Sequence, residues 1–130
     1  MRWIMKLNPD CVRDILIDVE NKSTFNNDVQ YLGPEDLKNL NKYTYDEIMY
    51  HIRQCSKNGF FIGEVKYYMD GGCSIVDLSP SAHEFLANIR QDNNWHKTKT
   101  IANKVGSYSI SALKEIAIQV ISKAISSNIN

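Results

Sequence analysis

The chain has 130 residues, enough for one compact domain with its own core and too few for two ordinary domains. Hydrophobic residues make up 43% and charged residues 23%, which is typical of a soluble globular protein and excludes a disordered one. Fifteen basic residues balance fifteen acidic ones, so no net charge draws the chain toward nucleic acid or anionic lipid. Because no run of about 18 apolar residues occurs, we expect no contact with a membrane through a spanning helix.

The three cysteines, Cys11, Cys55 and Cys73, form no CxxC pair. An odd number of cysteines without metal-ligand spacing indicates free thiols in a reducing cytoplasm. Cys11 and Cys55 fall within helical patterns, and we interpret both as small buried hydrophobic residues.

The first predicted helix begins at Asn8 and Pro9, since asparagine caps free backbone amides and proline suits the first helical position. A polar loop starts at Glu20. Beyond it we expect a short extended segment over residues 29–32 and one helical turn after Pro34.

The second predicted helix begins at Thr44, which forms a capping box with Glu47, and ends at Gly59. Its apolar residues recur at helical spacing and form one stripe, made of Ile48, Ile52 and Cys55 with Tyr45 or Met49.

A β-hairpin is predicted directly after this helix. Residues 60–68 are rich in β-branched and aromatic side chains, and residues 74–78 supply the return strand. Between them, Asp70–Gly71 and Gly71–Gly72 are pairs that favour two-residue hairpin turns.

Further helices are predicted after the hairpin. Ser79 and the proline after it begin one helix, a break is expected over residues 92–94, and the next helix ends at Gly106. A serine, Ser109 or Ser111, caps the last helix.

Helix, short strand, helix and hairpin follow one another in the order of a winged helix. The expected fold class is therefore α+β and mainly helical: a winged helix (helix-turn-helix plus β-hairpin wing) with a C-terminal helical extension. We expect a single domain over residues 1–130, with the winged-helix part at about 8–79 and C-terminal helices packed on it at about 80–127.

Several segments resemble a bacterial family of unknown function, whose small, winged-helix-like members are frequent in phages and prophages. The resemblance runs from about Asp10 to Ala117, and its most specific segments are "EIMYHI", "LSPSAHEFLANIRQDNNW" and "SISALKEIA". Ser79, Pro80 and His83 depart from the L-T-x-x-G-x-x-F-L pattern usual in that family after the hairpin. The resemblance implies a fold and a phage-associated setting, and no catalytic residues.

No enzyme site is predicted, and no cofactor or metal. His51, His83 and His96 lie on different predicted helices without metal-ligand spacing. We interpret His51 as a partly buried histidine that shares a hydrogen bond. The "MDGGC" turn lacks the lysine and the following helix of a phosphate-binding loop.

Double-stranded DNA is one predicted partner, and the helix from Thr44 would read it. Arg53 and Gln54 are candidates for base contacts and Lys57 for phosphate contacts. Two further candidates are Tyr50 on the same helix and Lys66 in the wing. Acidic residues at the start of the helix counter this interpretation, because carboxylates repel phosphates.

A second cationic region spans residues 90–104 and offers Lys97, Lys99 and Lys104 as phosphate contacts. Trp95 within it is either a stacking platform for bases or a core residue that anchors its helix, and the core interpretation is favoured.

The last helix has a wide apolar stripe, which includes Leu113, Ile116, Ala117, Val120, Ile121, Ala124 and Ile125. Either the stripe is central to the core or one side of it pairs with a second copy, so a homodimer through this helix is a further prediction.

Two functions from different classes follow. The first is a phage- or prophage-associated winged-helix protein that binds DNA and is regulatory, without catalysis. The alternative is a protein-interaction module on the same scaffold, which binds and modulates a host or phage protein.

Overall fold

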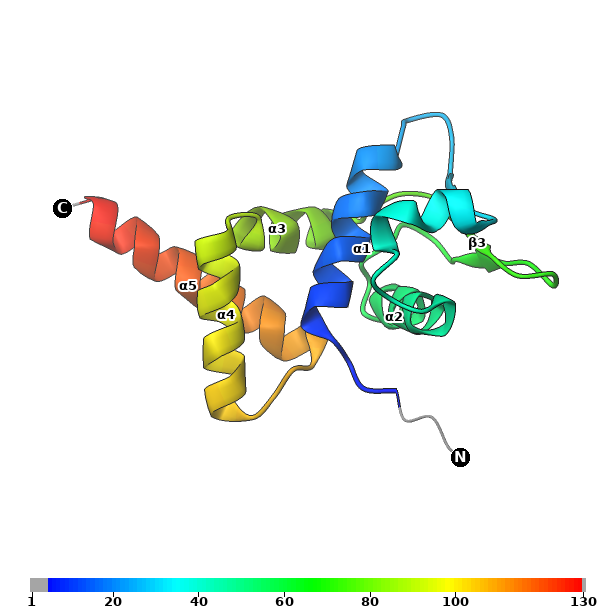
Figure 1. The fold of residues 1–130 in the computed structure, drawn as a ribbon. Helices are drawn as coiled ribbons and strands as arrows, with labels where there is room; N and C mark the ends of the chain where they lie inside the picture. Colours follow the sequence, from blue (N-terminus) through cyan, green and yellow to red (C-terminus); the bar gives the residue numbers. More distant parts are fainter. Residues whose placement is uncertain (1–4, 130) are drawn as a thin grey trace. The chain divides into compact units, whose positions relative to one another are not determined.

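The computed structural model describes residues 5–129 and is α+β and mainly helical, which confirms the broad fold class predicted from the sequence (Figure 1). Its contacts divide the chain into two compact units, Met1–Ala82 (unit 1) and His83–Asn130 (unit 2). Unit 1 contains α1 (Pro9–Lys22), β1 (Val29–Tyr31), the 3-10 helix η1 (Pro34–Leu40), α2 (Tyr45–Lys57), β2 (Lys66–Tyr67) and β3 (Cys73–Ile75). The chain continues through α3 (Pro80–Ile89), α4 (Asp92–Val105) and α5 (Ile110–Ile129).

Side-chain caps set the starts of α1 and α2, as predicted. Asn8 Oδ1 accepts a hydrogen bond from the N–H of Asp10 at 3.0 Å. At α2, Thr44 Oγ1 accepts from the N–H of Glu47 at 3.1 Å, while Glu47 Oε1 accepts from the N–H of Thr44 at 2.9 Å. Each pair satisfies backbone donors that have no partner inside the helix.

The end of α2 is fixed by Gly59, which adopts the left-handed φ of 75°. The N–H of Gly59 donates to the carbonyl of Ser56, and the N–H of Phe60 donates to the carbonyl of Cys55. These two bonds form a Schellman motif, which requires a residue that tolerates positive φ. The predicted stop at Gly59 is confirmed, and it directs the chain toward the hairpin.

The sheet has three antiparallel strands in the order β1–β3–β2. The strands are shorter than predicted: β2 pairs with β3 through only two residues, and Phe61 makes a single bridge to Leu78. The N–H of Tyr68 donates to the carbonyl of Gly72, and the N–H of Gly71 donates to the carbonyl of Tyr68, which leaves three residues between Tyr68 and Gly72 rather than the expected two-residue turn.

Gly72 brings the hairpin close to β1. Its φ is +86°, and a Cβ at this position would lie 2.3 Å from the carbonyl oxygen of Tyr31. Its N–H also donates to the hydroxyl of Tyr45 at 2.7 Å, which ties the hairpin to the first residue of α2. Only glycine allows this approach of two backbones.

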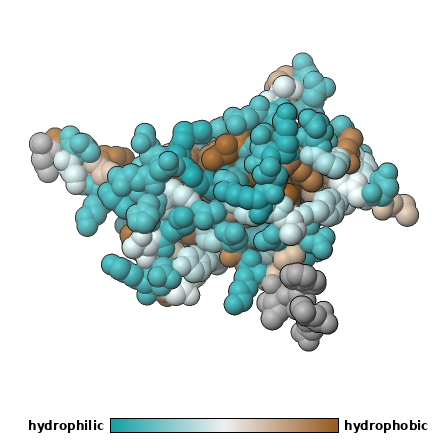
Figure 2. Space-filling model, viewed as in Figure 1, coloured by the Kyte–Doolittle hydropathy of each residue, from teal (hydrophilic) through white to brown (hydrophobic). Residues whose placement is uncertain are grey.

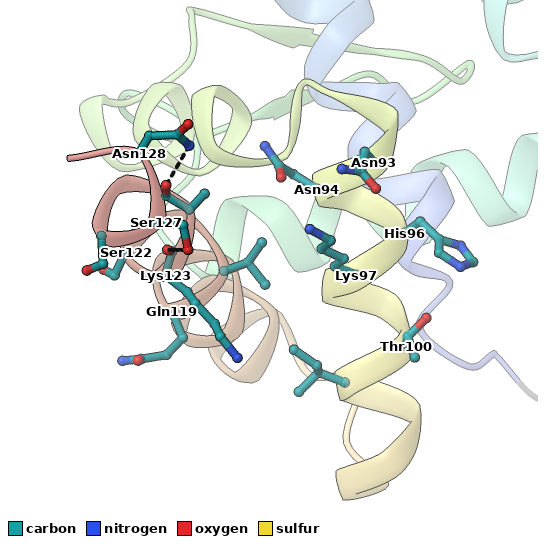
Figure 3. A pocket seen from close by; sticks show the side chains of 14 residues that line it. Asn93, Asn94, His96, Lys97, Thr100, Gln119, Ser122, Lys123, Ser127 and Asn128 are labelled. Atoms are coloured by element: carbon teal, nitrogen blue, oxygen red, sulfur yellow. Dashed lines mark hydrogen bonds between the residues drawn. The ribbon is translucent and has the colours of Figure 1, made fainter. Parts of the chain in front are cut away.

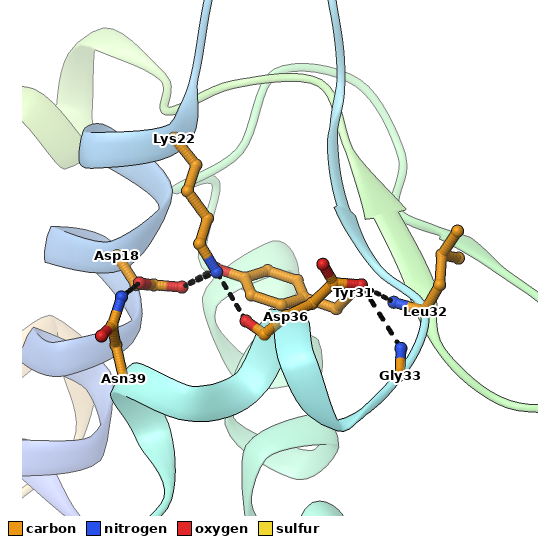
Figure 4. A network of polar contacts seen from close by, with 7 residues as sticks. All are labelled: Asp18, Lys22, Tyr31, Leu32, Gly33, Asp36 and Asn39. Atoms are coloured by element: carbon orange, nitrogen blue, oxygen red, sulfur yellow. Dashed lines mark hydrogen bonds and ion pairs between the residues drawn. The ribbon is translucent and has the colours of Figure 1, made fainter.

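α1 carries a buried carboxylate at the centre of a polar network (Figure 4). Asp18 is 3% exposed, and it accepts from the hydroxyl of Tyr31 at 2.7 Å and from Nδ2 of Asn39 at 3.1 Å. Lys22 Nζ lies 2.8 Å from Asp18 and also donates to the carbonyl of Asp36. The network links α1, β1 and η1, so it holds the segment that precedes α2.

The cores of both units are built mainly from the predicted helical stripes. In unit 1 the buried side chains include Val12, Ile15, Leu16, Ile48, Ile52, Cys55 and Phe60. In unit 2 they include Phe85, Leu86, Ile89, Trp95, Ala102, Leu113 and Ala117. Burying each such side chain contributes on the order of 1.5–3 kcal/mol, so these stripes fix the orientation of their helices.

The helices after the hairpin follow most of the predicted signals. Ser79 Oγ accepts from the N–H of Ala82 at the start of α3, and Ser109 Oγ accepts from that of Ala112 at the start of α5. Gly106 ends α4 with a φ of 75°. A break does separate α3 from α4, but it lies at residues 90–91 and not at the predicted residues 92–94, because Asp92 already begins α4.

Candidate functional site

The solvent-facing side of α2 carries the side chains predicted to contact DNA. Arg53 and Lys57 are exposed and lie four residues apart, which places them on one face of the helix. Tyr50 is half-buried, with its ring centre 5.8 Å from the guanidinium carbon of Arg53. Gln54 is also half-buried. The opposite side of α2 is buried in the core, so this face is held firmly toward solvent.

The hairpin contributes Tyr67 to the same surface. Tyr67, Tyr50 and Arg53 line a shallow pocket of about 370 Å³ together with Met49 and Asp46, and Met5 completes the lining. Burial and the neighbouring Cys73 raise the pKa of the Tyr67 phenol, while Arg53 acts in the opposite direction. The structure therefore brings Arg53 and Tyr67 close together.

Tyr67 is a surface residue that sequence reasoning missed, and Lys66 is placed elsewhere. Neighbouring residues of a strand point to opposite faces of the sheet, so Lys66 lies on the other face from Tyr67. Both side chains are exposed. The alternation of the strand is the signal that would have assigned one of the pair to the side of α2.

Charge is distributed unequally between the two units. Unit 1 carries nine Lys or Arg residues and twelve Asp or Glu residues, a formal charge of −3, whereas unit 2 carries six and three, a charge of +3. Within unit 1 the exposed Asp46 lies in the same pocket as Arg53. The net charge of zero is therefore the sum of an acidic unit and a basic unit.

The three predicted cations of α4 lie in different surroundings. Lys97 is exposed and lines a groove between α4 and α5, Lys99 lies 5.5 Å from the ring centre of Trp95, and Lys104 is exposed in the last turn. Trp95 itself is 4% exposed, so it is a core residue and not an accessible platform for bases. Of these three lysines, Lys97 is the one that lines the groove.

The histidine of α2 and the three cysteines are buried. His51 is 1% exposed and both of its ring nitrogens make hydrogen bonds. Cys11, Cys55 and Cys73 are buried as free thiols, and burial raises the pKa of Cys73 to about 11. Within residues 5–129, no three His, Cys, Asp or Glu side chains cluster closely enough to hold a metal ion. In the same range no helix combines the length and apolar character needed to cross a membrane.

Exposed apolar side chains are scattered over the surface. On the face seen in Figure 2, hydrophilic residues predominate and hydrophobic ones form small separate areas. On α5, the predicted stripe is buried at Leu113, Ala117 and Val120. Ile118 and Ile125 on another side of the helix are 44% and 53% exposed.

Comparison with known proteins gives a family and no individual relative. Neither the curated proteins nor the solved structures contain a match. The model of a family described as hypothetical protein (DUF2513) matches residues 6–109, which is most of the chain. That range covers unit 1 from Lys6 onward, together with α3 and α4. The chain therefore belongs to the family of hypothetical proteins DUF2513.

Proposed function

We propose that this chain is a winged-helix protein that binds double-stranded DNA and has a regulatory, non-catalytic role in a phage or prophage. One observation carries this function: α2 exposes Arg53 and Lys57 on one face, beside a hairpin whose Tyr67 shares a pocket with Arg53. An arginine and a lysine one helical turn apart can contact a base edge and a phosphate of the same groove.

The order of elements in unit 1 supports the winged-helix interpretation. α1 precedes β1, η1 precedes α2, and the β2–β3 hairpin follows α2. β1 pairs with β3, so the hairpin and the first strand form one sheet. In this interpretation η1 and α2 are the helix-turn-helix pair, α2 is the recognition helix and the hairpin is the wing.

The length of α2 and the hydrogen-bond donors on it fit duplex DNA. Its 13 residues span about 20 Å at 1.5 Å per residue, and the major groove of B-DNA admits a helix. Arg53 suits a guanine, Gln54 suits an adenine, and Lys57 suits a phosphate. Asp46 near the helix start disfavours phosphate contacts there, so contacts are expected toward the C-terminal half of α2.

The test is binding of the full chain to fluorescent duplexes of mixed sequence at low salt. Replacing Arg53 and Lys57 with alanine removes one base contact and one phosphate contact, and we expect binding to weaken by about 5- to 150-fold. The matched control replaces Lys38 and Lys42, which lie beside Glu35 and Asp14, and should leave binding unchanged. Wild-type protein that leaves all duplexes unbound at micromolar concentration rules out this function.

The phage setting and the compartment rest on the sequence. The segments that resemble a family frequent in phages and prophages lie within the range that matches DUF2513 or directly after it. Cys11, Cys55 and Cys73 are free thiols, which suits a reducing cytoplasm. Expression of the chain from an induced prophage, followed by its location in cell fractions, tests both points.

A second candidate function is a protein-interaction module that binds and modulates a host or phage protein. It is favoured by the charge of −3 on unit 1 and by the side chains around Arg53, namely Met49, Tyr50 and Tyr67. Arginine, methionine and tyrosine are enriched at protein interfaces. A partner that is retained by the wild-type chain and by Lys38→Ala, but lost with Arg53→Glu, in a sample that binds no DNA would favour this function.

We further propose that the protein dimerises through α5. Ile118, Ile125 and Ile129 recur at spacings of seven and four residues, so they lie on one face, and all three are exposed. A second copy would bury this row. Sedimentation of the wild-type chain and of Ile125→Asp tests the dimer, and a monomeric wild type at high micromolar concentration contradicts it.

A further inference from the structure

A groove between α4 and α5 has the composition of an anion site. It lies wholly within unit 2 and has a volume of about 1020 Å³. Lys97 extends from α4 and Lys123 extends from α5 into the space between the two helices (Figure 3). Among the fourteen described residues that line the groove there is no carboxylate. Two cations on facing helices therefore share one concave surface.

No acidic side chain offsets these two lysines within the described lining of the groove. The three acidic residues of unit 2, Glu84, Asp92 and Glu115, lie outside the groove lining, while the unit as a whole carries +3. A concave surface lined by charge of one sign concentrates the field and raises the local concentration of counter-ions. The groove is thus suited to a ligand with several negative charges.

Uncharged donors complete the lining. Asn93, Asn94 and Gln119 offer amide groups and Ser122 offers a hydroxyl. Phosphate oxygens in nucleic-acid complexes accept hydrogen bonds from these same side-chain types as well as from lysine. Alongside the apolar Ile101, Val120 and Ala124, the groove therefore offers the lysine, amide and hydroxyl groups that contact phosphates.

Among the described residues, the groove lining includes no Phe, Tyr or Trp ring on which bases could stack, and the imidazole of His96, its one ring, points away from α5 (Figure 3). Trp95 is buried, with Lys99 at 5.5 Å from its ring centre, and neither residue lines the groove. Proteins that hold single strands use exposed aromatic side chains for successive bases. The chemistry present favours the phosphodiester backbone over exposed bases.

We propose that the α4–α5 groove binds the phosphodiester backbone of duplex DNA through Lys97 and Lys123, as a contact separate from α2. This inference rests on the DNA binding proposed above and assigns to unit 2 a sequence-independent share of it. The lysines of the groove set much of the salt dependence of binding, whereas α2 supplies contacts to bases.

The experiment measures the dissociation constant of the full chain for one duplex at several salt concentrations. Lys97→Gln with Lys123→Gln removes two charges and keeps side chains of high helix propensity. The logarithm of the association constant falls as the logarithm of the salt concentration rises. We expect this slope to become less steep by about 1.8 in the Gln variant, since each phosphate contact contributes about 0.9. Lys38→Gln with Lys42→Gln makes the same charge change outside the groove and should leave the slope unchanged. Lys97→Arg with Lys123→Arg should retain it.

The results separate this inference from the proposed function. If the wild type binds duplex but the Gln variant keeps its slope and affinity, the groove is not a phosphate contact although the protein binds DNA. If the wild type binds no duplex, both proposals are overturned. If it instead binds adenosine monophosphate or pyrophosphate in a manner lost with Lys97→Gln and Lys123→Gln, the groove holds a free phosphate compound and the DNA assignment is wrong.

Discussion

The backbone N–H of Asn8 donates a hydrogen bond to Nε2 of His51 at 2.8 Å, across 43 residues of chain. The other ring nitrogen, Nδ1, lies 2.7 Å from the carbonyl oxygen of Glu47. Because a carbonyl only accepts, Nδ1 carries the ring proton and Nε2 is the acceptor. Asn8 also caps α1, so one neutral imidazole joins the start of α1 to α2.

Protonation of His51 would place an N–H donor against the N–H of Asn8. Burial lowers the pKa of His51 below its usual 6.5, although the carbonyl and carboxylate of Glu47 act in the opposite direction. The unfolded chain therefore binds this proton more readily than the folded one. We predict that the free energy of unfolding is constant above about pH 6.5 and falls as the pH decreases below it, by at most about 1.4 kcal/mol per pH unit. Urea unfolding between pH 7.5 and 5.5 measures this slope.

The control for this slope uses the exposed histidines. His83→Gln with His96→Gln should retain the slope, because both rings are exposed. His51→Gln should lower the free energy of unfolding at pH 7.5 and flatten the profile. A wild-type profile that is flat down to pH 5.5 contradicts the neutral state assigned to His51.

Asp18 and Asp14 form a matched pair of carboxylates on α1. Each accepts a tyrosine hydroxyl and lies near a lysine, but Asp18 is 3% exposed and the side chain of Asp14 is 26% exposed. Since removal of a hydrogen-bond partner costs more in a buried site, we predict that Asp18→Asn lowers the free energy of unfolding by about 2–3 kcal/mol and Asp14→Asn by about 1 kcal/mol. Denaturant unfolding compares them, and equal losses would show that burial of Asp18 is unimportant.

The sequence predicts the boundaries that depend on local bonds. Asn8, Thr44, Gly59, Ser79 and Gly106 act at helix ends as expected, because each cap is completed within a few residues of chain. No distant partner is needed for these signals.

Features that need distant partners are predicted less well. The strand expected over residues 60–68 reduces to Lys66–Tyr67, because its pairing depends on how much of β3 lies opposite. The 3-10 helix Pro34–Leu40 is longer than the single turn expected, and Lys22 and Asn39 connect it to α1. In the candidate site too, the sequence predicts local features better than those that need distant partners. The exposed face of α2 follows from its helical period, whereas the approach of Tyr67 to Arg53 and the presence of Lys97 and Lys123 in one groove depend on tertiary packing.

Gly72 and Gly59 provide a test of the close approach of the hairpin to β1. Both have positive φ, but a Cβ on Gly59 meets no atom within 4 Å, whereas one on Gly72 would lie 2.3 Å from the carbonyl oxygen of Tyr31. We predict that Gly59→Ala costs about 1–2 kcal/mol from backbone strain alone. Gly72→Ala should cost clearly more and displace the hairpin. Thermal unfolding measures the first effect, and amide chemical shifts of residues 66–75 measure the second. Equal losses would contradict the close approach.

The reactivity of the three cysteines tests whether they are buried in the core. Cys11, Cys55 and Cys73 are each 0% exposed, and burial raises the pKa of Cys11 to about 12, with smaller contributions from Glu47 and Asp14. The thiolate is the reactive form of cysteine. We therefore predict that in the native protein at pH 8 the thiols react with a thiol reagent only as fast as the structure unfolds around them, whereas in denatured protein all three cysteines react at once. Ser56→Cys, on the half-exposed side of α2, is the positive control and should add one rapidly reacting thiol. A rapid thiol in the native wild type would show that one of the three cysteines lies at the surface.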